Sequence, residues 1–148
     1  MEKINIKLVA TPYRLSDNIR SKLEELDSIL FEGEVPYPKD GCYWWIAYMN
    51  HEPVAFAGLK VLKGCNKNVG FLCRAGVLKL ASGKGLQRKL IAIRLNKAKK
   101  MKLSEVITYT HNANYKSAAN LLRSGMRFYC PKNKWAGQQA LYFHYVFH

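Results

Sequence analysis

Apolar and polar residues alternate over residues 4–8 of the chain. This period of two predicts a half-buried strand. After a proline-containing turn, apolar residues recur at helical spacing from Ile19 to Leu30. Ser16 precedes this segment at the N-cap position, so an amphipathic helix is expected over about residues 16–31.

The middle of the chain is rich in aromatic and β-branched residues. Two such segments, residues 43–49 and 53–62, are separated by three polar residues and predict a β-hairpin. A third apolar stretch, residues 69–80, is expected to form the next strand. From Gly85 to Lys100 the apolar spacing becomes helical, and lysines gather at the predicted C-terminus, where cations offset the helix dipole.

The last third of the chain continues the alternation of strands and helices. A short strand over residues 106–110 precedes a helix that Asn114 can cap and Gly125 can end. Two strand-like segments, residues 126–130 and 140–147, close the chain. The element order β-α-β-β-β-α-β-α-β-β predicts a mixed α/β fold. The length of 148 residues predicts a single domain over residues 1–148.

Charge is distributed unevenly along the chain, whose formal net charge is +14. Residues 1–52 hold 6 Lys or Arg and 9 Asp or Glu, whereas residues 53–148 hold 18 Lys or Arg and one acid, Glu105. Such a basic portion attracts polyanions or phosphorylated ligands. The acidic stretch from Asp17 to Asp40 is a candidate receptor for a cation. For any one lysine, a contribution to solubility is the simpler interpretation.

The cysteines and the apolar runs bear on the cell compartment. Four cysteines are spread along the chain without a Cys-x-x-Cys pair or a histidine at ligand spacing, so neither a metal site nor a disulfide framework is expected. No apolar run approaches the roughly 18 residues of a membrane span. The first residues do not resemble a signal peptide. We therefore expect a cytoplasmic protein with reduced thiols and no membrane partner.

A Gly-Lys-Gly turn, Gly83 to Gly85, lies where a predicted strand hands over to a predicted helix. Glycines let the backbone approach a ligand closely, and the first N–H groups of a helix form an anion site. Lys84, Arg88 and Lys89 add positive charge, so the turn is a candidate phosphate site. A tight turn with no ligand is the alternative interpretation. The spacing fits neither the nucleoside-triphosphate loop nor the full dinucleotide fingerprint.

The context of this turn resembles the GNAT superfamily of N-acetyltransferases. The family signature is Gln/Arg-x-x-Gly-x-Gly/Ala between the fourth strand and the next helix, and residues 76–90 are similar to it. A second family feature, an Asn that opens a helix ending in Gly plus an apolar residue, is matched by residues 114–126. The resemblance implies a central mixed, mostly antiparallel sheet flanked by helices. Ser82 and Gln87 depart from the preferred residues of the signature.

The resemblance implies acetyl-CoA (coenzyme A) as the cofactor. It places the pyrophosphate on the turn and the helix start, the pantetheine arm along a strand edge and against Asn114, and the 3′-phosphate near Lys116. Exposed peptide groups at a strand edge suit an amide-containing arm. The implied cofactor-binding residues are Val77, Leu78, Lys79, Gly83, Lys84, Gly85, Leu86, Gln87, Arg88, Asn114 and Lys116.

The catalysis implied by the resemblance is direct attack of an amine on the thioester, without an acyl-enzyme. The frequent general acid of the family is a Tyr seven residues after the Asn, where this chain has Leu121. Candidates for proton transfer are His111, Tyr109, Tyr115 and Glu34, and for each of them a structural role is the alternative. We expect Cys73 to be a core residue.

Three functions remain open. The first is acetyl transfer to a small-molecule or protein amine, with Asp27, Glu32, Glu34 and Asp40 attracting the cation. The second has an acceptor linked to nucleic acid, such as aminoacyl-tRNA or a modified base. There Lys132, Lys134 and Trp135 support stacking, unless Trp135 packs beneath the final strand. The third is a catalytically silent module that binds coenzyme A.

Overall fold

The computed structural model describes residues 3–64 and 66–148. Its element order is that predicted from the sequence, with one added 3-10 turn, η1. The strands are β1 (Ile4–Ala10), β2 (Tyr43–Met49), β3 (Glu52–Lys63), β4 (Asn68–Val77), β5 (Glu105–His111), β6 (Arg127–Phe128) and β7 (Ala140–Val146). The helices are α1 (Asp17–Leu30), η1 (Lys79–Ala81), α2 (Leu86–Lys100) and α3 (Tyr115–Arg123).

The strands form one mixed sheet of order β1-β2-β3-β4-β5-β7-β6. β4 and β5 pair in parallel, whereas β1 with β2, β2 with β3, and β7 with both β5 and β6 are antiparallel. The mixed, mostly antiparallel sheet expected from the resemblance is therefore confirmed. Two compact units make up the chain: Met1–Lys60 with Cys73–Leu90, and Val61–Leu72 with Ile91–His148.

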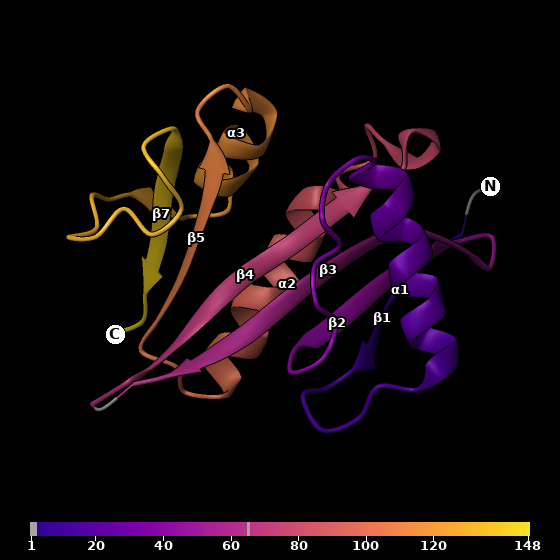
Figure 1. The fold of residues 1–148 in the computed structure, drawn as a ribbon, viewed down its shortest axis with the longest axis horizontal. Coiled ribbons are helices and arrows are strands. Elements are labelled where there is room, and N and C mark those ends of the chain that lie inside the picture. The colour runs from indigo at the N-terminus through magenta and orange to yellow at the C-terminus, as the bar shows by residue number, and fades with distance from the viewer. Residues whose placement is uncertain (1–2, 65) are drawn as a thin grey trace. The chain divides into compact units, whose positions relative to one another are not determined.

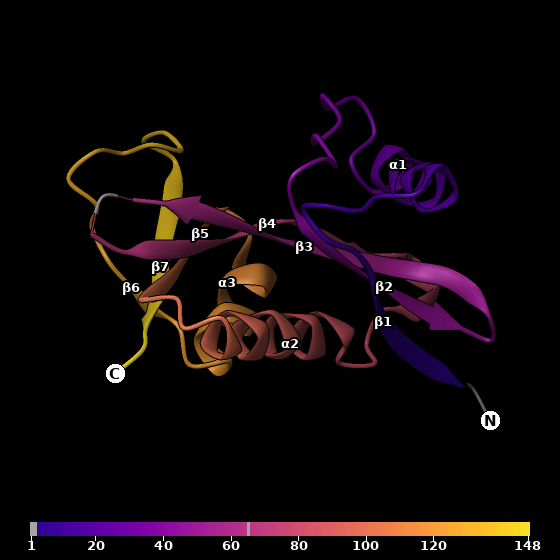
Figure 2. The same cartoon turned by 90° about the horizontal axis from the view of Figure 1, so that it is seen from below.

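In the first unit, β2 and β3 are buried on both faces. Their register pairs Trp44 with Gly58 and Trp45 with Ala57, and all four lie in tightly packed surroundings. α1 covers one face of these strands, and the first turn of α2 lies on the other (Figure 2). The hairpin turn places Asn50 and His51 at positive φ, the conformation of a tight two-residue turn.

The predicted cap of α1 is confirmed, and one detail of β1 is not. Ser16 Oγ accepts a hydrogen bond from Ile19 N at 3.2 Å, and the helix begins at Asp17. Leu8, expected on the buried face of β1, is exposed. The pairing of β1 with β2 shifts register between Leu8 and Ala10, and this irregularity interrupts the alternation.

In the second unit, β5 lies beside β7, and α3 follows β5 (Figure 1). The parallel ladder between β4 and β5 is short and ends at the pair Phe71–Ile107. One residue further on, the buried hydroxyl of Thr108 donates to Leu72 O at 2.8 Å. A side-chain hydrogen bond therefore links β4 and β5 just beyond the point where their backbone ladder ends.

Burial along α2 does not follow its apolar residues at every position. Leu86 and Leu90 are buried, but Ile93 is only half-buried, whereas Arg94 is buried. No helix among the described residues is both long and apolar enough to cross a membrane.

Candidate functional site

The turn that leads into α2 depends on its two glycines. Gly83 has φ +77° and Gly85 has φ +74°, a conformation that L residues adopt only with strain. A Cβ atom at either position would meet no atom within 4 Å. The backbone conformation, rather than a lack of space, therefore requires glycine, and the space beside both residues is open to a ligand.

The first turn of α2 presents backbone donors at the same place. Lys89 N donates to Gly85 O at 3.1 Å, which begins the helical ladder. The N–H groups of residues 86–88 precede that bond and have no acceptor within the helix. Leu86 is buried and anchors the turn, while Arg88 and Lys89 are exposed. The sequence has no acid between Glu52 and Glu105, so this surface suits an anion.

β4 contains an irregularity that the sequence analysis did not anticipate. In a regular strand, consecutive side chains point to opposite faces. A Cβ on Gly58 would lie 2.5 Å from Cys73 Sγ and 2.6 Å from the Trp44 ring. The Cys73 side chain therefore lies on the same face of the sheet as the Trp44 ring. Arg74, the next residue, reaches α1 on this same face and lies 4.3 Å from the Phe31 ring. The two side chains therefore share a face, as in a β-bulge.

The bulge determines which peptide groups face the outer edge of β4. Leu78 N donates to Val54 O at 2.8 Å, so the Leu78 peptide faces β3. Because backbone groups alternate between edges after the bulge, those of Ala75 and Val77 face away from β3. The β4–β5 ladder has already ended at Phe71. The end of β4 thus offers peptide groups to an amide-containing ligand.

The predicted strand over residues 69–80 is too long at its end. β4 ends at Val77, Leu78 precedes η1, and Lys79 lies within η1. The Leu78 amide is already bonded to Val54, so it cannot serve a ligand arm without losing that bond. Val77 is the last residue of β4.

The second unit carries the remaining residues that the resemblance singled out. Asn114 Oδ1 accepts a hydrogen bond from Ser117 N at 3.2 Å, so the predicted cap of α3 is confirmed. Lys116 is exposed on the first turn of that helix. Leu121 is buried in the core, and no hydroxyl stands at this position. This position therefore lacks the proton donor that the resemblance associates with it.

His111, Tyr109 and Tyr115 also belong to the second unit. Tyr109 and His111 are two residues apart on β5 and share its exposed face. His111 Nδ1 accepts from Ala113 N at 3.1 Å, so the neutral ring carries its proton on Nε2 and can donate from there. Tyr115 is 78% exposed at the start of α3.

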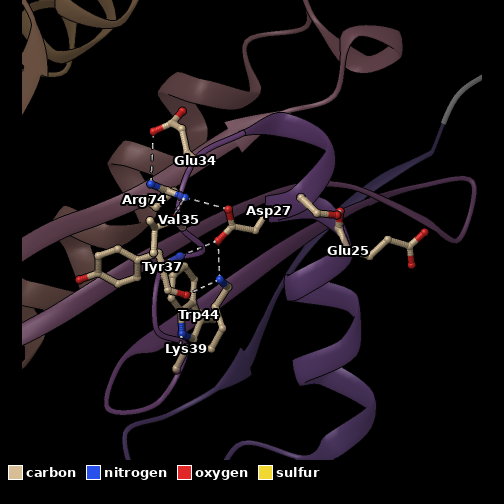
Figure 3. Close-up of polar contacts among 9 residues, drawn as sticks. Glu25, Asp27, Glu34, Val35, Tyr37, Lys39, Trp44 and Arg74 are labelled. Carbon is tan, nitrogen blue, oxygen red and sulfur yellow. Dashed lines mark hydrogen bonds and ion pairs between the residues drawn. The ribbon is translucent and has the colours of Figure 1, made fainter. Parts of the chain in front are cut away.

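The acidic loop region, expected to attract a cation, is neutralised from within the first unit. Asp27 is 2% exposed and receives Lys39 Nζ on Oδ2 at 2.5 Å and Arg74 NH1 on Oδ1 at 2.9 Å (Figure 3). Glu34 lies 3.5 Å from Arg74 NH2, and Asp40 lies 2.8 Å from Arg20. Only Glu32 of the four expected carboxylates is exposed without an ion pair among the described contacts. The interpretation of this region as a cation receptor is therefore not supported by its geometry.

This cluster also fixes the loop that follows α1. The Tyr37 amide donates to Asp27 Oδ2 at 3.1 Å, and Lys39 Nζ donates to Tyr37 O. Trp44 Nε1 donates to Lys39 O at 2.8 Å. Burial raises the pKa of Asp27, but the hydrogen bonds from Lys39, Arg74 and the Tyr37 amide outweigh it, and the net pKa is lowered. The carboxylate is thus held ionised inside the protein.

The sequence carries a signal for this cluster. Asp27 lies four residues after Leu23 and three before Leu30, within the apolar stripe of α1. An acid in such a stripe is expected to have buried cationic partners.

Cys73 is buried, as predicted. Its hydrogen bond to Cys42 lowers the pKa of the Cys42 thiol, although burial of that thiol acts in the opposite direction.

Within the first unit, the Gly83–Arg88 turn follows β4 and η1 along the chain, and Glu34 lies in the loop after α1. Within the second unit it brings Tyr109 and His111 together on β5 and places Asn114, Tyr115 and Lys116 at the start of α3.

Comparison with known proteins gives a family and a fold. The model of the acetyltransferase (GNAT) family matches residues 10–126. No curated protein matches the chain.

Among solved structures, Arabidopsis thaliana Naa50 in complex with the bisubstrate analogue CoA-Ac-MVNAL is similar, with a TM-score of 0.78. The two sequences are 16% identical, and the match covers 97% of this chain and 99% of the other. A Bacillus subtilis acetyltransferase in complex with CoA is 16% identical with a TM-score of 0.70, covering 99% and 100% of the chains. The ribosomal-protein-S18-alanine N-acetyltransferase of Escherichia coli is 13% identical with a TM-score of 0.73, covering 97% and 94%.

Proposed function

This chain belongs to the GNAT acetyltransferase family, and we propose that it moves the acetyl group of acetyl-CoA to a primary amine by direct attack of the amine. The observation that carries the proposal is the turn before α2. Two glycines at positive φ with open space beside them, and N–H groups at a helix start, together fit a diphosphate.

The proposed cofactor contacts lie at the end of β4 and at the starts of α2 and α3. The N–H groups of Leu86, Gln87 and Arg88 bind the diphosphate, and Lys84 adds charge beside them. The outward peptide groups of Val77 and Ala75 bind the amide-bearing arm. Asn114 retains its side-chain N–H groups as donors while its oxygen caps α3, and Lys116 is the proposed partner of the 3′-phosphate. Bound acetyl-CoA supplies an activated acetyl thioester.

The proposed proton donors are Tyr109 and His111. Both lie on the exposed face of β5, and His111 keeps its Nε2 proton while Nδ1 accepts from Ala113. Glu34 is a weaker candidate because it is paired with Arg74, and Tyr115 because it points to solvent. Positioning of the reactants supplies most of the rate, so loss of one donor lowers the rate without abolishing it. The proposed location is the cytosol, since the cysteines show no disulfide pattern.

Thermal denaturation with and without acetyl-CoA tests the cofactor site. We expect saturating acetyl-CoA to raise the melting temperature by several degrees, because it binds the native state. Gly85→Glu should remove that increase. Gly41→Glu is the matched control, because Gly41 also has a positive φ, +81°, and open space around its Cβ position. An equal increase in both variants would contradict the proposed diphosphate site.

Release of free thiol from acetyl-CoA in the presence of an amine panel tests the transfer. Tyr109→Phe keeps the ring and removes the hydroxyl, so kcat should fall while acetyl-CoA binding is unchanged. A protein that binds acetyl-CoA but releases no thiol above the hydrolysis background with any amine would be a silent binding module, and the transferase proposal would be wrong.

A further inference from the structure

Four aromatic rings form a cluster in the second unit, which we call the aromatic platform: Phe71, Tyr109, Trp135 and Tyr142. Phe71 and Tyr109 are nearly parallel, with 8° between planes and centroids 6.4 Å apart. Trp135 stands almost perpendicular to both, at 5.6 Å and 5.3 Å. Tyr142 is buried beneath it, whereas Trp135 is 39% and Tyr109 is 45% exposed. Aromatic area is therefore left open to solvent on a packed base.

The loop between β6 and β7, which carries Trp135, is held in place by Tyr142. The Tyr142 hydroxyl accepts a hydrogen bond from Ala136 N at 2.9 Å and donates to Gly137 O at 3.0 Å. Gly137 N also donates to Lys134 O at 3.0 Å, which closes a turn around the indole. Trp135 is thus presented in a fixed orientation, and little ordering is needed for a planar group to stack on it.

The charge around the platform selects the kind of ligand. Lys132 and Lys134 are exposed on the same loop, and the sequence holds no acid after Glu105. Glu105 itself is paired with Lys67 at 3.0 Å and lies 3.7 Å from His144. A cationic peptide or amine would meet repulsion here, whereas a planar, neutral base on a phosphate backbone meets complementary charge.

We propose that the aromatic platform binds single-stranded RNA, with a base stacked on Trp135, its edge against Tyr109, and neighbouring phosphates on Lys132 and Lys134. Stacking on aromatic rings beside basic side chains is the usual mode of single-strand recognition. The inference rests on the proposed function only for its consequence, that the amine acceptor is carried by RNA. Binding itself requires no acetyl transfer.

Fluorescence titration with a ten-nucleotide single-stranded RNA of mixed sequence tests the platform directly. Trp44 and Trp45 are buried, so quenching by a stacked base reports on Trp135. We expect Trp135→Ala to weaken RNA binding about 10-fold, measured by anisotropy of labelled RNA, and Trp135→Phe to retain most of the affinity. Phe128→Ala is the control, because Phe128 is an exposed aromatic of the same unit outside the platform. Its affinity should match that of the unmodified protein.

Salt dependence separates a local site from diffuse attraction. Lys132→Gln with Lys134→Gln should reduce the slope of log affinity against log salt by about 1.4, the value for two phosphate contacts on a single strand. Lys99→Gln with Lys100→Gln removes the same charge at the end of α2 and should change the slope less. Equal effects of the two pairs, or an unchanged affinity of Trp135→Ala, would overturn the proposal.

Two further results would assign the platform to another ligand. If saturating coenzyme A abolishes RNA quenching and Trp135→Ala weakens coenzyme A binding, the platform belongs to the cofactor. If a short peptide with a free N-terminus quenches Trp135 while RNA does not, the acceptor is a peptide. Each result overturns the RNA site. The titration contains no acetyl-CoA, so failure of the transferase proposal appears separately, in the thermal and thiol assays.

Discussion

Removal of the Asp27 carboxylate should destabilise the protein strongly. Asp27 and Lys39 have side chains that are each 2% exposed, and they are joined at 2.5 Å. In Asp27→Ala, the Lys39 ammonium keeps only Tyr37 O and the Trp44 ring, at 5.6 Å from its centroid, as partners. Breaking a buried pair by removing one partner costs about 3–5 kcal/mol. That is a large fraction of the roughly 5–15 kcal/mol that stabilises a typical domain.

Urea denaturation followed by tryptophan fluorescence measures this effect. With a slope of about 2 kcal/mol per M, the expected loss lowers the unfolding midpoint by about 2 M. Asp40→Ala is the matched control, because it breaks an exposed ion pair with Arg20 and such pairs contribute little. The double variant Asp27→Ala with Lys39→Met should recover part of the loss, since no ammonium is then buried without its carboxylate.

Loss of the Asp27 carboxylate should also be visible locally, at the Tyr37 amide. Hydrogen exchange of the Tyr37 amide should accelerate in Asp27→Ala, because its acceptor is Asp27 Oδ2. If Asp27→Ala shifted the midpoint no more than Asp40→Ala, or if the double variant were less stable than Asp27→Ala, the buried-pair argument would be refuted.

Three further predictions concern stability. The pKa of Asp27 is lowered in the folded state, so the stabilisation from its ionised form is present above the unfolded pKa of about 3.9 and is lost as pH falls through the folded value. Urea midpoints should therefore decrease below about pH 4. This decrease should be smaller in Asp27→Asn. Gly58→Ala places a Cβ 2.5 Å from Cys73 Sγ and should cost about 1–3 kcal/mol, so an unchanged urea midpoint would contradict the packing described. Ser16→Ala removes the acceptor of the Ile19 amide and should cost about 1 kcal/mol, with a loss of helical circular dichroism on heating that begins at lower temperature; Ser21→Ala, within the same helix, should cost less.

The parts of the fold that sequence reasoning predicted correctly depend on neighbours in the chain. The Ser16 cap, the Asn114 cap and the Gly-Lys-Gly turn are local, because each depends on backbone conformation within about four residues. The element order follows from periodicity for the same reason. The match of the loop to the family signature then gave the cofactor.

The parts that it missed depend on contacts between distant residues. Asp27, Lys39 and Arg74 are separated by up to 47 positions, and only the fold brings them together. The same holds for the aromatic platform, where Trp135 meets Phe71. The bulge at Cys73 and Arg74 is a shift of one residue in a strand whose composition is otherwise ordinary, so no local pattern marks it. Apolar residues continue through η1, so apolar periodicity placed the end of the strand at Leu80 rather than at Val77.

The doubled residue in β4 has a consequence for how the chain tolerates length changes. Deleting either Cys73 or Arg74 would leave one side chain where two now share a face, so the strand would alternate regularly and residues 75–77 would keep their present faces. Gly76 would still be needed where Leu30 leaves no room for a Cβ. The same deletion in a regular part of the strand would reverse every residue after it. A single-codon deletion at the doubled position would thus remove the local bend while leaving the outward peptide groups of Ala75 and Val77 in place.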